Sequence, residues 1–259
     1  APAELPGGLG LEIRDGVGTL RLSGPRGNAL SGEMMLDLSS AIRTVAGENS
    51  VRVVRLASAH PKLFCPGLDL VALADYTRGE MGGYMRTFST VLTDLFALKK
   101  PVLASVSGAA VAGGCLLALT ADWRILRTGA VMGLNEVKVG VPLPWTAVAL
   151  LKSAAPASHH AAVALLGRNF EGDAAIAAGL AHEVVEPEAF EAKVAERLAE
   201  FAEKDAYAYG VTKGHLRGAA VGAMREREEA HLDEFLDGWF SDATQARIAK
   251  TVAGLKARG

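Results

Sequence analysis

Alternating and periodic apolar residues along the chain predict an α/β protein. Leu9–Arg14 and Val17–Leu22 each alternate between apolar and polar residues, and Asp15-Gly16 between them is typical of a tight hairpin turn. Val51–Ala57 is a short, nearly continuous apolar run of the kind that forms a buried strand. We therefore expect an antiparallel hairpin followed by a buried strand.

Predicted helices and strands alternate along the next part of the chain. Apolar residues recur at helical spacing after Ser31, which predicts a helix with Ser31 as its N-cap, and Tyr84–Leu98 shows the same spacing. Pro101–Ser107 is a further strand, and the stretch GAAVAGGCLLALTADW at residues 108–123 follows it directly. Repetition of strand, loop and helix is typical of parallel strands joined by crossover helices.

The second half of the chain is expected to be mostly helical. The segments we expect are short strands at Trp123–Leu126, Val131–Gly133 and His182–Val185, and helices at Ala147–Leu166, Asp173–Ala178, Glu188–Lys204 and Arg225–Asp237. The helices beyond about Asp205 carry apolar stripes with no obvious core to fill, so we expect them to contact another subunit. We divide the chain into a core of residues 1–200 and a C-terminal helical oligomerisation region of residues 201–259.

Composition and charge narrow the class of protein. Half of the residues are apolar and 22% are charged, which suits one folded α/β domain with appendages. A net charge of −2 argues against a general nucleic-acid binder. Two cysteines cannot form a disulfide framework, no apolar run reaches the length of a membrane span, and the N-terminal residues do not resemble a signal peptide. We therefore expect a cytoplasmic protein, or one of the mitochondrial matrix if a transit peptide has been removed.

The glycine-rich residues 108–114, GAAVAGG, join a strand to a helix, which is where phosphate-binding motifs lie. A P-loop requires Lys and Ser or Thr after its last glycine, but Cys115 and Leu116 stand there, and the glycine spacing does not fit a dinucleotide-binding fingerprint. Two interpretations remain. The small residues allow close helix–strand packing, the simpler interpretation of this stretch alone, or they let the free N–H groups of a helix N-terminus face a developing negative charge, as in an oxyanion hole.

A second loop, LFCPGLDL at residues 63–70, favours the oxyanion interpretation. Pro66-Gly67 is a turn signal, and such a turn can aim the N–H of Leu68 outward. We expect Asp69 to hold the turn by local hydrogen bonds rather than to act in catalysis. Two loops in neighbouring strand–helix units can thus offer one N–H each to a single oxygen.

Several motifs, in their order and spacing, resemble those of the crotonase (enoyl-CoA hydratase/isomerase) superfamily. They are LFCPGLDL, KPVLASVSGAAVAGGCLLALTADWRIL at residues 100–126 and MGLNEVKVGVP at residues 132–142, together with NAL at 28–30 and AAIAAGLAHEVVEPE at 174–188. The resemblance implies a spiral of ββα units, a C-terminal helical trimerisation region and an acyl-CoA thioester held in an oxyanion hole. Carried over by position, the two donors are the N–H groups of Leu68 and Gly113.

The resemblance also implies an acid–base residue. In the hydratases of this superfamily two glutamates flank the substrate, and the matching positions here are Leu116, which cannot exchange a proton, and Glu136. A single carboxylate resembles most the pattern of the mitochondrial-type 3,2-enoyl-CoA isomerases. Moving a double bond needs one base, which takes a proton from the α carbon and returns it to the γ carbon through a thioester enolate. The alternatives are other crotonase-type chemistry on an acyl-CoA (hydratase, hydrolase or decarboxylase) and a non-catalytic acyl-CoA-binding protein.

Further residues are candidates for binding the acyl-CoA substrate. Basic residues on loops near the expected nucleotide position could meet the phosphates of CoA, and small or apolar residues could line the thioester. The candidates are Arg26, Ala29, Pro66, Gly67, Leu116 and Lys256. Coenzyme A is part of the substrate, so no separate cofactor is expected.

Metal chemistry and cysteine chemistry are not expected. His159 and His160 are neighbours in sequence and so point apart on a helix, without the spacing of metal ligands. Cys115 has no histidine near it in sequence, and small buried cysteines are common. The expected partners are an acyl-CoA thioester and further copies of the chain, as a homotrimer or a dimer of trimers, with no nucleic acid and no membrane span.

Overall fold

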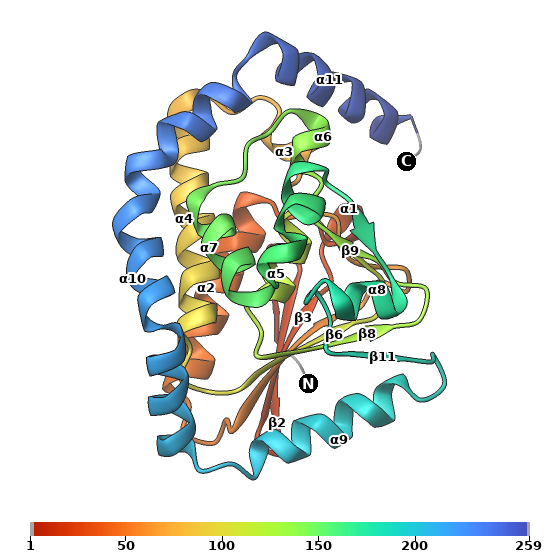
Figure 1. Cartoon of the computed structure of the whole chain (residues 1–259), viewed down its shortest axis with the longest axis vertical. Coiled ribbons are helices and arrows are strands. Elements are labelled where there is room, and N and C mark those ends of the chain that lie inside the picture. The colour runs from red at the N-terminus through yellow and green to blue at the C-terminus, as the bar shows by residue number, and fades with distance from the viewer. Residues whose placement is uncertain (1–2, 258–259) are drawn as a thin grey trace.

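Two β-sheets form the centre of the protein, and helices surround them (Figure 1). The computed structural model describes residues 3–257, apart from the side chains of Ala3, Glu4 and Lys256. The larger sheet has seven strands in the order β1 (Ala3–Leu5), β2 (Leu9–Arg14), β3 (Val17–Leu22), β4 (Val53–Ser58), β6 (Val102–Val106), β8 (Trp123–Arg127) and β11 (Glu183–Val185). The smaller sheet has four, in the order β10 (Asn169–Phe170), β9 (Met132–Gly133), β7 (Ala109–Val111) and β5 (Leu63–Cys65).

The chain passes repeatedly from the larger sheet to the smaller one and then into a helix. It runs from β4 to β5, from β6 to β7 and from β8 to β9, and within each sheet these strands lie parallel. The helices that follow the three pairs are α3 (Leu70–Leu73) with α4 (Arg78–Ala97), α5 (Gly113–Leu119), and α6 (Glu136–Val139) with α7 (Trp145–Ala154). This repetition confirms the predicted α/β spiral of ββα units.

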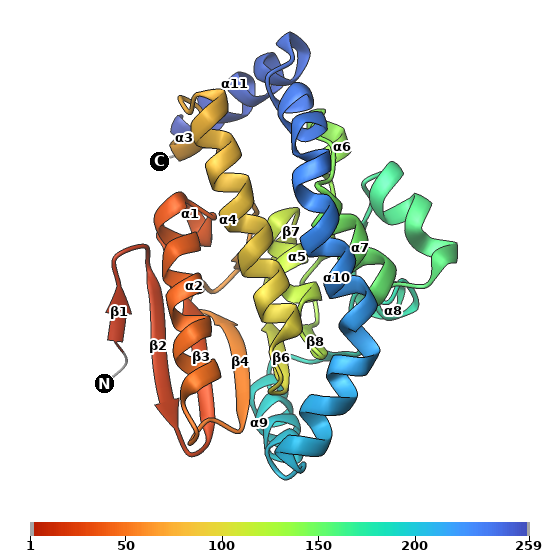
Figure 2. The ribbon, with the colours of Figure 1, turned by 90° about the vertical axis from the view of Figure 1, so that its left-hand side faces the viewer.

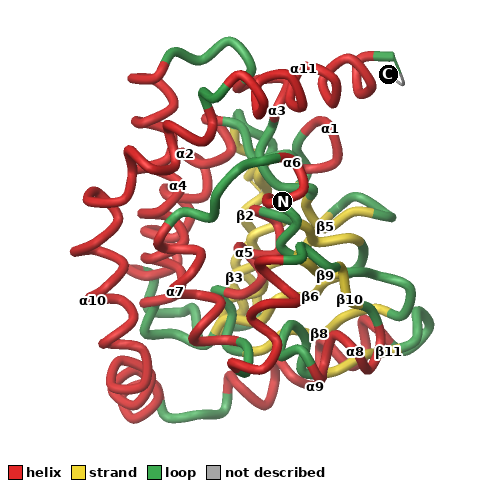
Figure 3. The backbone as a smooth tube through the Cα atoms, turned by 45° about the horizontal axis from the view of Figure 1, so that its top comes forward, coloured by secondary structure: helices red, strands yellow, loops and turns green. Residues whose placement is uncertain are grey.

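The remaining helices lie before, between and after these units. They are α1 (Pro25–Asn28), α2 (Gly32–Gly47), α8 (Gly172–Ala177), α9 (Phe190–Ala202), α10 (Ala206–Trp239) and α11 (Asp242–Lys256), with a 3₁₀ turn at Ala157–His159 and a π-helical turn at Ala161–Leu165. Helices α2, α4 and α10 lie side by side on one face of the larger sheet (Figure 2). In the tube view, α11 crosses above α3 and α6 (Figure 3). Within residues 3–257, no helix combines the length and apolar character that crossing a bilayer requires.

Alternation along the central strands divides the apolar side chains between two layers. Val54, Val102 and Leu126 belong to the main core under α2 and α4. Their neighbours Val53, Leu103 and Ile125 point to the opposite face, where they pack against Phe190, Val194 and Leu198 of α9. Because successive side chains of a strand point to opposite faces, an uninterrupted apolar strand is the expected sequence for a sheet covered on both sides.

Local sequence signals predict the first elements correctly. The predicted hairpin is confirmed as β2 and β3, and Ser31 is the N-cap of α2, since its side chain accepts a hydrogen bond from the N–H of Met34 at 3.2 Å.

The prediction of one helix over Ala147–Leu166 is wrong, because α7 ends at Ala154 and the chain continues through extended residues. Pro156 explains the break, since proline lacks an N–H and disfavours helical geometry in the residue before it.

The long helix α10 has a core partner in its own chain, contrary to the sequence expectation. Leu232, Phe235 and Trp239 are buried, and α10 packs along α4 and α7. The Glu228 carboxylate of α10 joins the three helices. It accepts a hydrogen bond from the hydroxyl of Ser89 on α4 at 2.7 Å and one from the backbone N–H of Thr146 on α7 at 2.8 Å. Nearer its start, α10 leaves Tyr207 and Leu216 about 80% exposed. Contact of the C-terminal helical region, residues 201–259, with another subunit stays a prediction.

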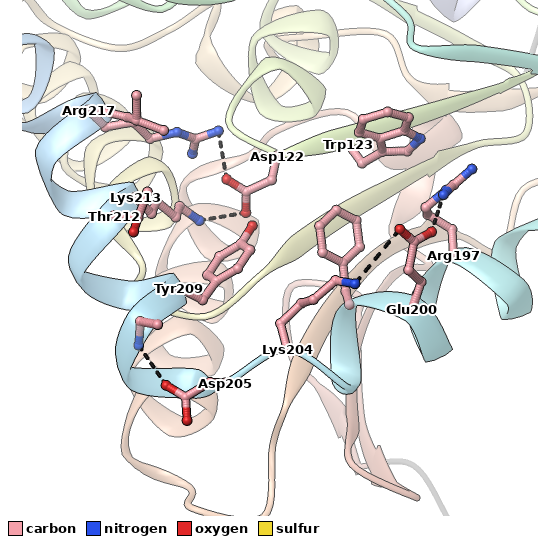
Figure 4. A pocket seen from close by; sticks show the side chains of 13 residues that line it. Asp122, Trp123, Arg197, Glu200, Lys204, Asp205, Tyr209, Thr212, Lys213 and Arg217 are labelled. Carbon is pink, nitrogen blue, oxygen red and sulfur yellow. Dashed lines mark hydrogen bonds and ion pairs between the residues drawn. The ribbon is translucent and has the colours of Figure 1, made fainter.

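A buried ion-pair cluster fixes the start of α10 to the end of the larger sheet (Figure 4). The Asp122 carboxylate accepts the backbone N–H of Val102 at 2.7 Å and pairs with Lys213 at 2.7 Å and with Arg217 at 2.9 Å. Asp122 therefore anchors one end of β6 to α10. Burial lowers the pKa of Lys213 to about 8. The cluster forms the floor of a cavity of about 700 Å³ between α9 and α10, at the opposite end of the molecule from α6.

Helix α5 begins directly against β5, and glycine makes this possible. A Cβ atom on Gly114 would overlap the carbonyl group of Cys65 and would lie 2.7 Å from the Cβ of Cys65. The two neighbouring ββα units therefore touch through backbone atoms at this point. The small residues at 108–114 therefore allow close helix–strand packing, which is one of the two interpretations of this stretch from the sequence.

We predict that Gly114→Ala lowers the free energy of unfolding by at least about 1–3 kcal/mol, because the added methyl group must push the two units apart. The matched control is Gly222→Ala in α10, where an added Cβ meets nothing within 4 Å. That variant should gain about 0.5–1 kcal/mol, as expected for alanine in a helix interior. Urea unfolding followed by circular dichroism measures both, and equal stability of the two variants would contradict the close approach at Gly114.

Candidate active site

The loop after β5 and the start of α5 meet, as the sequence predicted. Gly67 has a φ of +98°, and a Cβ on it would lie 3.1 Å from the backbone nitrogen of Gly113. A Cβ on Gly113 would in turn lie 3.2 Å from the side chains of Leu68 and Leu30. Only glycine combines this left-handed conformation with so close an approach. The structure thus brings the backbone of Leu68 and the backbone of Gly113 to one place.

Both backbone N–H groups at this place lack an acceptor. Gly113 is the first residue of α5, so its N–H has no partner inside the helix. The N–H of Leu68 also takes no part in the pairing around it, where Leu30 donates to Gly67 at 2.8 Å and Asp69 donates to Leu30 at 3.2 Å. Within the described residues neither N–H donates a hydrogen bond. A backbone N–H without a partner in the chain is free to donate to an acceptor oxygen of a bound molecule.

Backbone strain gathers around these two donors. Among residues 3–257, the non-glycine residues with positive φ are Asp15, Arg26, Asn28 and Ala112, and the last three flank the site. Ala112, with φ 50° and ψ −127°, directly precedes Gly113 and turns β7 into α5. Such conformations cost about 1–3 kcal/mol each and persist where the surroundings hold them in place.

Asn28 shows how the surroundings hold one of these residues. Its side-chain amide donates to the hydroxyl of Ser58 at 2.8 Å and to the backbone carbonyl of Phe64 at 3.0 Å. Its backbone carbonyl accepts a hydrogen bond from the thiol of Cys65 at 3.1 Å. The NAL segment is therefore bound to the ends of β4 and β5. It places Leu30 against the loop that carries Leu68.

Glu136 supplies a carboxyl group at the start of α6. The residue is half-buried, but its Oε2 atom is buried and has no hydrogen-bond partner in the described structure. Burial raises the pKa of Glu136 from 4.5 to about 7, against a smaller opposing effect of its own backbone N–H. Glu136 lies close enough to α5 for its charge to add to the effect of burial, which raises the pKa of the Cys115 thiol to about 12. The carboxyl group thus lies near the helix that begins with the free N–H of Gly113.

Leu116 brings no proton-exchanging group to this site. It lies on α5, is 1% exposed and belongs to the main core. Glu136 is therefore the one carboxyl group that the structure places near α5 among the residues predicted for the site. Cys115 is fully buried, and its raised pKa keeps it a thiol, in agreement with its expected lack of a nucleophilic role.

Arg26 and Asp69 form an ion pair that the sequence did not predict. The Arg26 Nε donates to both carboxylate oxygens of Asp69 at 2.9 Å, and a second guanidinium nitrogen also contacts the carboxylate. The Asp69 Oδ1 further accepts the backbone N–H of Ala72 at 3.1 Å and so caps α3. The predicted local role of Asp69 is confirmed. The pairing of residues 43 positions apart carried no signal in the sequence.

The other predicted substrate-binding residues lie at different distances from the two donors. Pro66 and Gly67 form the turn before Leu68, and Ala29 is buried beside Leu30. Lys256 is the last residue of α11, and its side chain lies outside the described part of the structure. A role of these residues and of Arg26 in binding CoA stays a prediction.

Tyr84 is a site residue that sequence reasoning missed. The sequence placed it only at the start of the predicted helix 84–98, whereas in the structure it lies within α4 and is buried. Its hydroxyl group donates to the backbone carbonyl of Leu30 at 2.8 Å. It thereby fixes Leu30, which hydrogen-bonds to the two residues on either side of Leu68. Residues 3–257, side chains included where they are described, contain no cluster of three or more histidine, cysteine or acidic side chains that could hold a metal ion.

The spiral of ββα units is the fold of a crotonase-type protein. A family model described as enoyl-CoA hydratase/isomerase matches residues 12–250. The chain belongs to the enoyl-CoA hydratase/isomerase family.

Similar proteins include isomerases and hydratases. Human mitochondrial enoyl-CoA delta isomerase 1 is 27% identical over 245 residues, which cover 93% of this chain and 80% of the relative. The (E)-benzylidenesuccinyl-CoA hydratase of Thauera aromatica is 32% identical over 212 residues, covering 82% of this chain and 81% of the relative. The crystal structure of human mitochondrial delta3-delta2-enoyl-CoA isomerase superposes with a TM-score of 0.90 at 26% identity, over 97% of this chain and 99% of that one.

We predict that Glu136 makes the protein less stable as the pH rises from about 5 to 7. Its folded-state pKa of about 7 lies above the ordinary 4.5, so in this range the unfolded chain releases a proton that the folded protein keeps. Glu136→Gln removes this effect. The variant should therefore gain stability over the wild type as the pH rises, with the difference levelling off above pH 7.

The control for this prediction is Glu188→Gln, which alters an exposed glutamate. Its difference from the wild type should not change between pH 5 and pH 8. Urea unfolding at a series of pH values measures all three proteins. Parallel curves for the wild type and Glu136→Gln would show that Glu136 ionises normally in the folded protein.

Proposed function

We propose that the protein is an enoyl-CoA isomerase, which converts a 3-enoyl-CoA into a 2-enoyl-CoA. The observation that carries this proposal is the carboxyl group of Glu136, which has a buried oxygen without a partner and whose charge acts on Cys115 of α5, the helix that begins with the free N–H of Gly113. The N–H of Leu68, in the adjoining loop, also has no acceptor in the described residues. The apolar residue Leu116 stands where the resemblance places a second glutamate in hydratases. One base and two oxyanion donors are the groups that a double-bond shift needs.

The proton moves out and back through one carboxylate. Ionised Glu136 takes a proton from C2 of the 3-enoyl thioester, and the electron pair moves into the thioester carbonyl to form a dienolate. The oxygen of this dienolate accepts the N–H groups of Leu68 and Gly113. Protonated Glu136 then gives its proton to C4, the double bond forms between C2 and C3, and the carboxylate is regenerated.

Magnitudes divide the work between the donors and the base. Loss of one well-placed oxyanion donor costs about 2.7–4 kcal/mol of transition-state stabilisation. A positioned general base contributes roughly 10²–10⁴-fold in rate. A glutamate with a pKa near 7 is a stronger base than an ordinary glutamate and is about half ionised near pH 7, so it can both take and return the proton.

Hydration of a 2-enoyl-CoA is the second candidate function. The 32% identity with the Thauera aromatica hydratase supports it. It requires a second group to position and activate water, and Leu116 offers none. The other substrate-binding candidates, Arg26, Ala29, Pro66 and Lys256, serve either reaction, since both use a CoA thioester.

We predict that the purified protein forms 2-enoyl-CoA from a 3-enoyl-CoA, measured by the ultraviolet absorbance of the conjugated thioester and by mass spectrometry. Glu136→Gln should lower kcat by about 10²–10⁴-fold, because an amide cannot accept the proton. Glu188→Gln, far along the chain and exposed, should retain the wild-type rate. Accumulation of 3-hydroxyacyl-CoA by the wild type would favour the hydratase, and full activity of Glu136→Gln would exclude Glu136 as the base.

We further predict that deuterium placed at C2 of the substrate appears at C4 of the product in ordinary water. A single carboxylate that carries the proton between two carbons delivers part of the deuterium before it exchanges with solvent. Mass spectrometry of the product, with fragmentation to locate the label, measures the transfer. Complete loss of deuterium during a single turnover would point to two different proton-carrying groups.

A further inference from the structure

The oxyanion hole of the proposed function depends on the direction of one N–H group in a loop. The N–H of Gly113 is fixed by α5, but that of Leu68 follows a glycine with positive φ and precedes a helix of only four residues. Two backbone hydrogen bonds hold the peptide groups on either side of Leu68. The N–H of Leu30 donates to the carbonyl of Gly67, and the N–H of Asp69 donates to the carbonyl of Leu30. The residue next to it, Asp69, provides a further attachment.

Asp69 is a buried charge with defined partners. Its side chain is 1% exposed, which is costly for a carboxylate unless cations or N–H groups neutralise it. The cation is Arg26, whose guanidinium group contacts both carboxylate oxygens, and the N–H group is that of Ala72. Loss of Arg26 would leave the carboxylate buried with a single described hydrogen bond, so Asp69 and the loop would have to move towards water.

The backbone at Arg26 is shaped for this contact. Arg26 has φ 50° and ψ 38°, and Gly27 and Asn28 also have positive φ, so three left-handed residues follow one another. An arginine enters this region only where other interactions compensate. The side chain of Asn28 fixes the turn on one side, at Ser58 and Phe64, and the Arg26–Asp69 pair fixes it on the other.

We propose that Arg26 is a positioning residue of the oxyanion hole, which acts through Asp69 to fix the direction of the Leu68 N–H. This inference rests on the proposed function, because it assigns a role within the same site. It differs from the role expected from the sequence, in which Arg26 binds a phosphate of CoA. The two roles predict different kinetics, since positioning acts on the reacting carbonyl and phosphate binding acts on the nucleotide end of the substrate.

The test compares Arg26→Met with the wild type on two substrates: a 3-enoyl-CoA and the same 3-enoyl thioester of pantetheine, which lacks the nucleotide. If Arg26 positions the loop, kcat falls about tenfold on both thioesters, less than the 10²–10³-fold that follows loss of a whole oxyanion donor. The ratio of the two KM values stays that of the wild type. A rise in KM for the CoA thioester alone, with kcat unchanged, would overturn the proposal in favour of phosphate binding.

Two further variants test the route through Asp69. The matched control is Arg78→Met on α4, whose side chain is 45% exposed, against 43% for Arg26, and which also pairs with carboxylates, Asp233 and Asp237. It should keep wild-type kinetics on both substrates. The double variant Arg26→Met/Asp69→Asn should be no slower than the slower of its two single variants, because both changes act on one loop. Multiplied losses would overturn the shared route.

A spectroscopic readout separates this proposal from the proposed function. An unreactive conjugated aromatic CoA thioester absorbs at longer wavelength when its carbonyl group is polarised by hydrogen-bond donors. The wild type should shift the absorption, and Arg26→Met and Arg26→Lys should shift it less when both are saturated with the thioester. A full shift in these folded variants would overturn the positioning role. A wild type that polarises the thioester but forms no 2-enoyl-CoA would refute the isomerase and leave the positioning role supported.

Discussion

The backbone N–H groups of Leu68 and Gly113 donate to no acceptor in the described residues, and the surrounding structure must keep them so. A backbone N–H without an acceptor forgoes a hydrogen bond worth about 0.5–1.5 kcal/mol net, so a fold that keeps two of them free is stabilised by other contacts. Here β5 and β7 are adjacent parallel strands that end at the same edge, and each leads into a helix. That arrangement brings the N–H groups of Leu68 and Gly113 together, and the strained residues Asn28 and Ala112 lie where it is enforced.

The electrostatics around Glu136 follow from the same arrangement. Burial of the Glu136 carboxyl group raises its pKa to about 7. With Leu116 in the core, the described neighbourhood contains one predicted proton carrier and two fixed dipoles. In the reaction proposed for this site, charge develops on the thioester oxygen and the proton returns to the same substrate.

Local sequence signals predicted the fold where local forces decide it. The Asp15-Gly16 turn and the alternation around it defined the first hairpin, and the family motifs located Leu68, Gly113 and Glu136. Contacts between distant segments were invisible. The Arg26–Asp69 pair, the bond from Tyr84 to Leu30 and the burial of α10 against α4 each depend on how the chain folds back on itself. Periodicity placed Tyr84 at the start of a helix, but it could not show the carbonyl group that its hydroxyl group reaches.

The use of main-chain donors has a consequence for how such a protein can diverge. Replacement of the side chain at position 68 leaves the amide of that residue in place, whereas position 136 supplies its oxygen atoms only through a side chain. For the proposed function, inherited substitutions can therefore reshape the walls of the acyl site while the main-chain donors persist. The proposed proton transfer, by contrast, depends on the one side chain at position 136, and its replacement by a group that cannot accept a proton would leave a protein that binds the thioester without converting it.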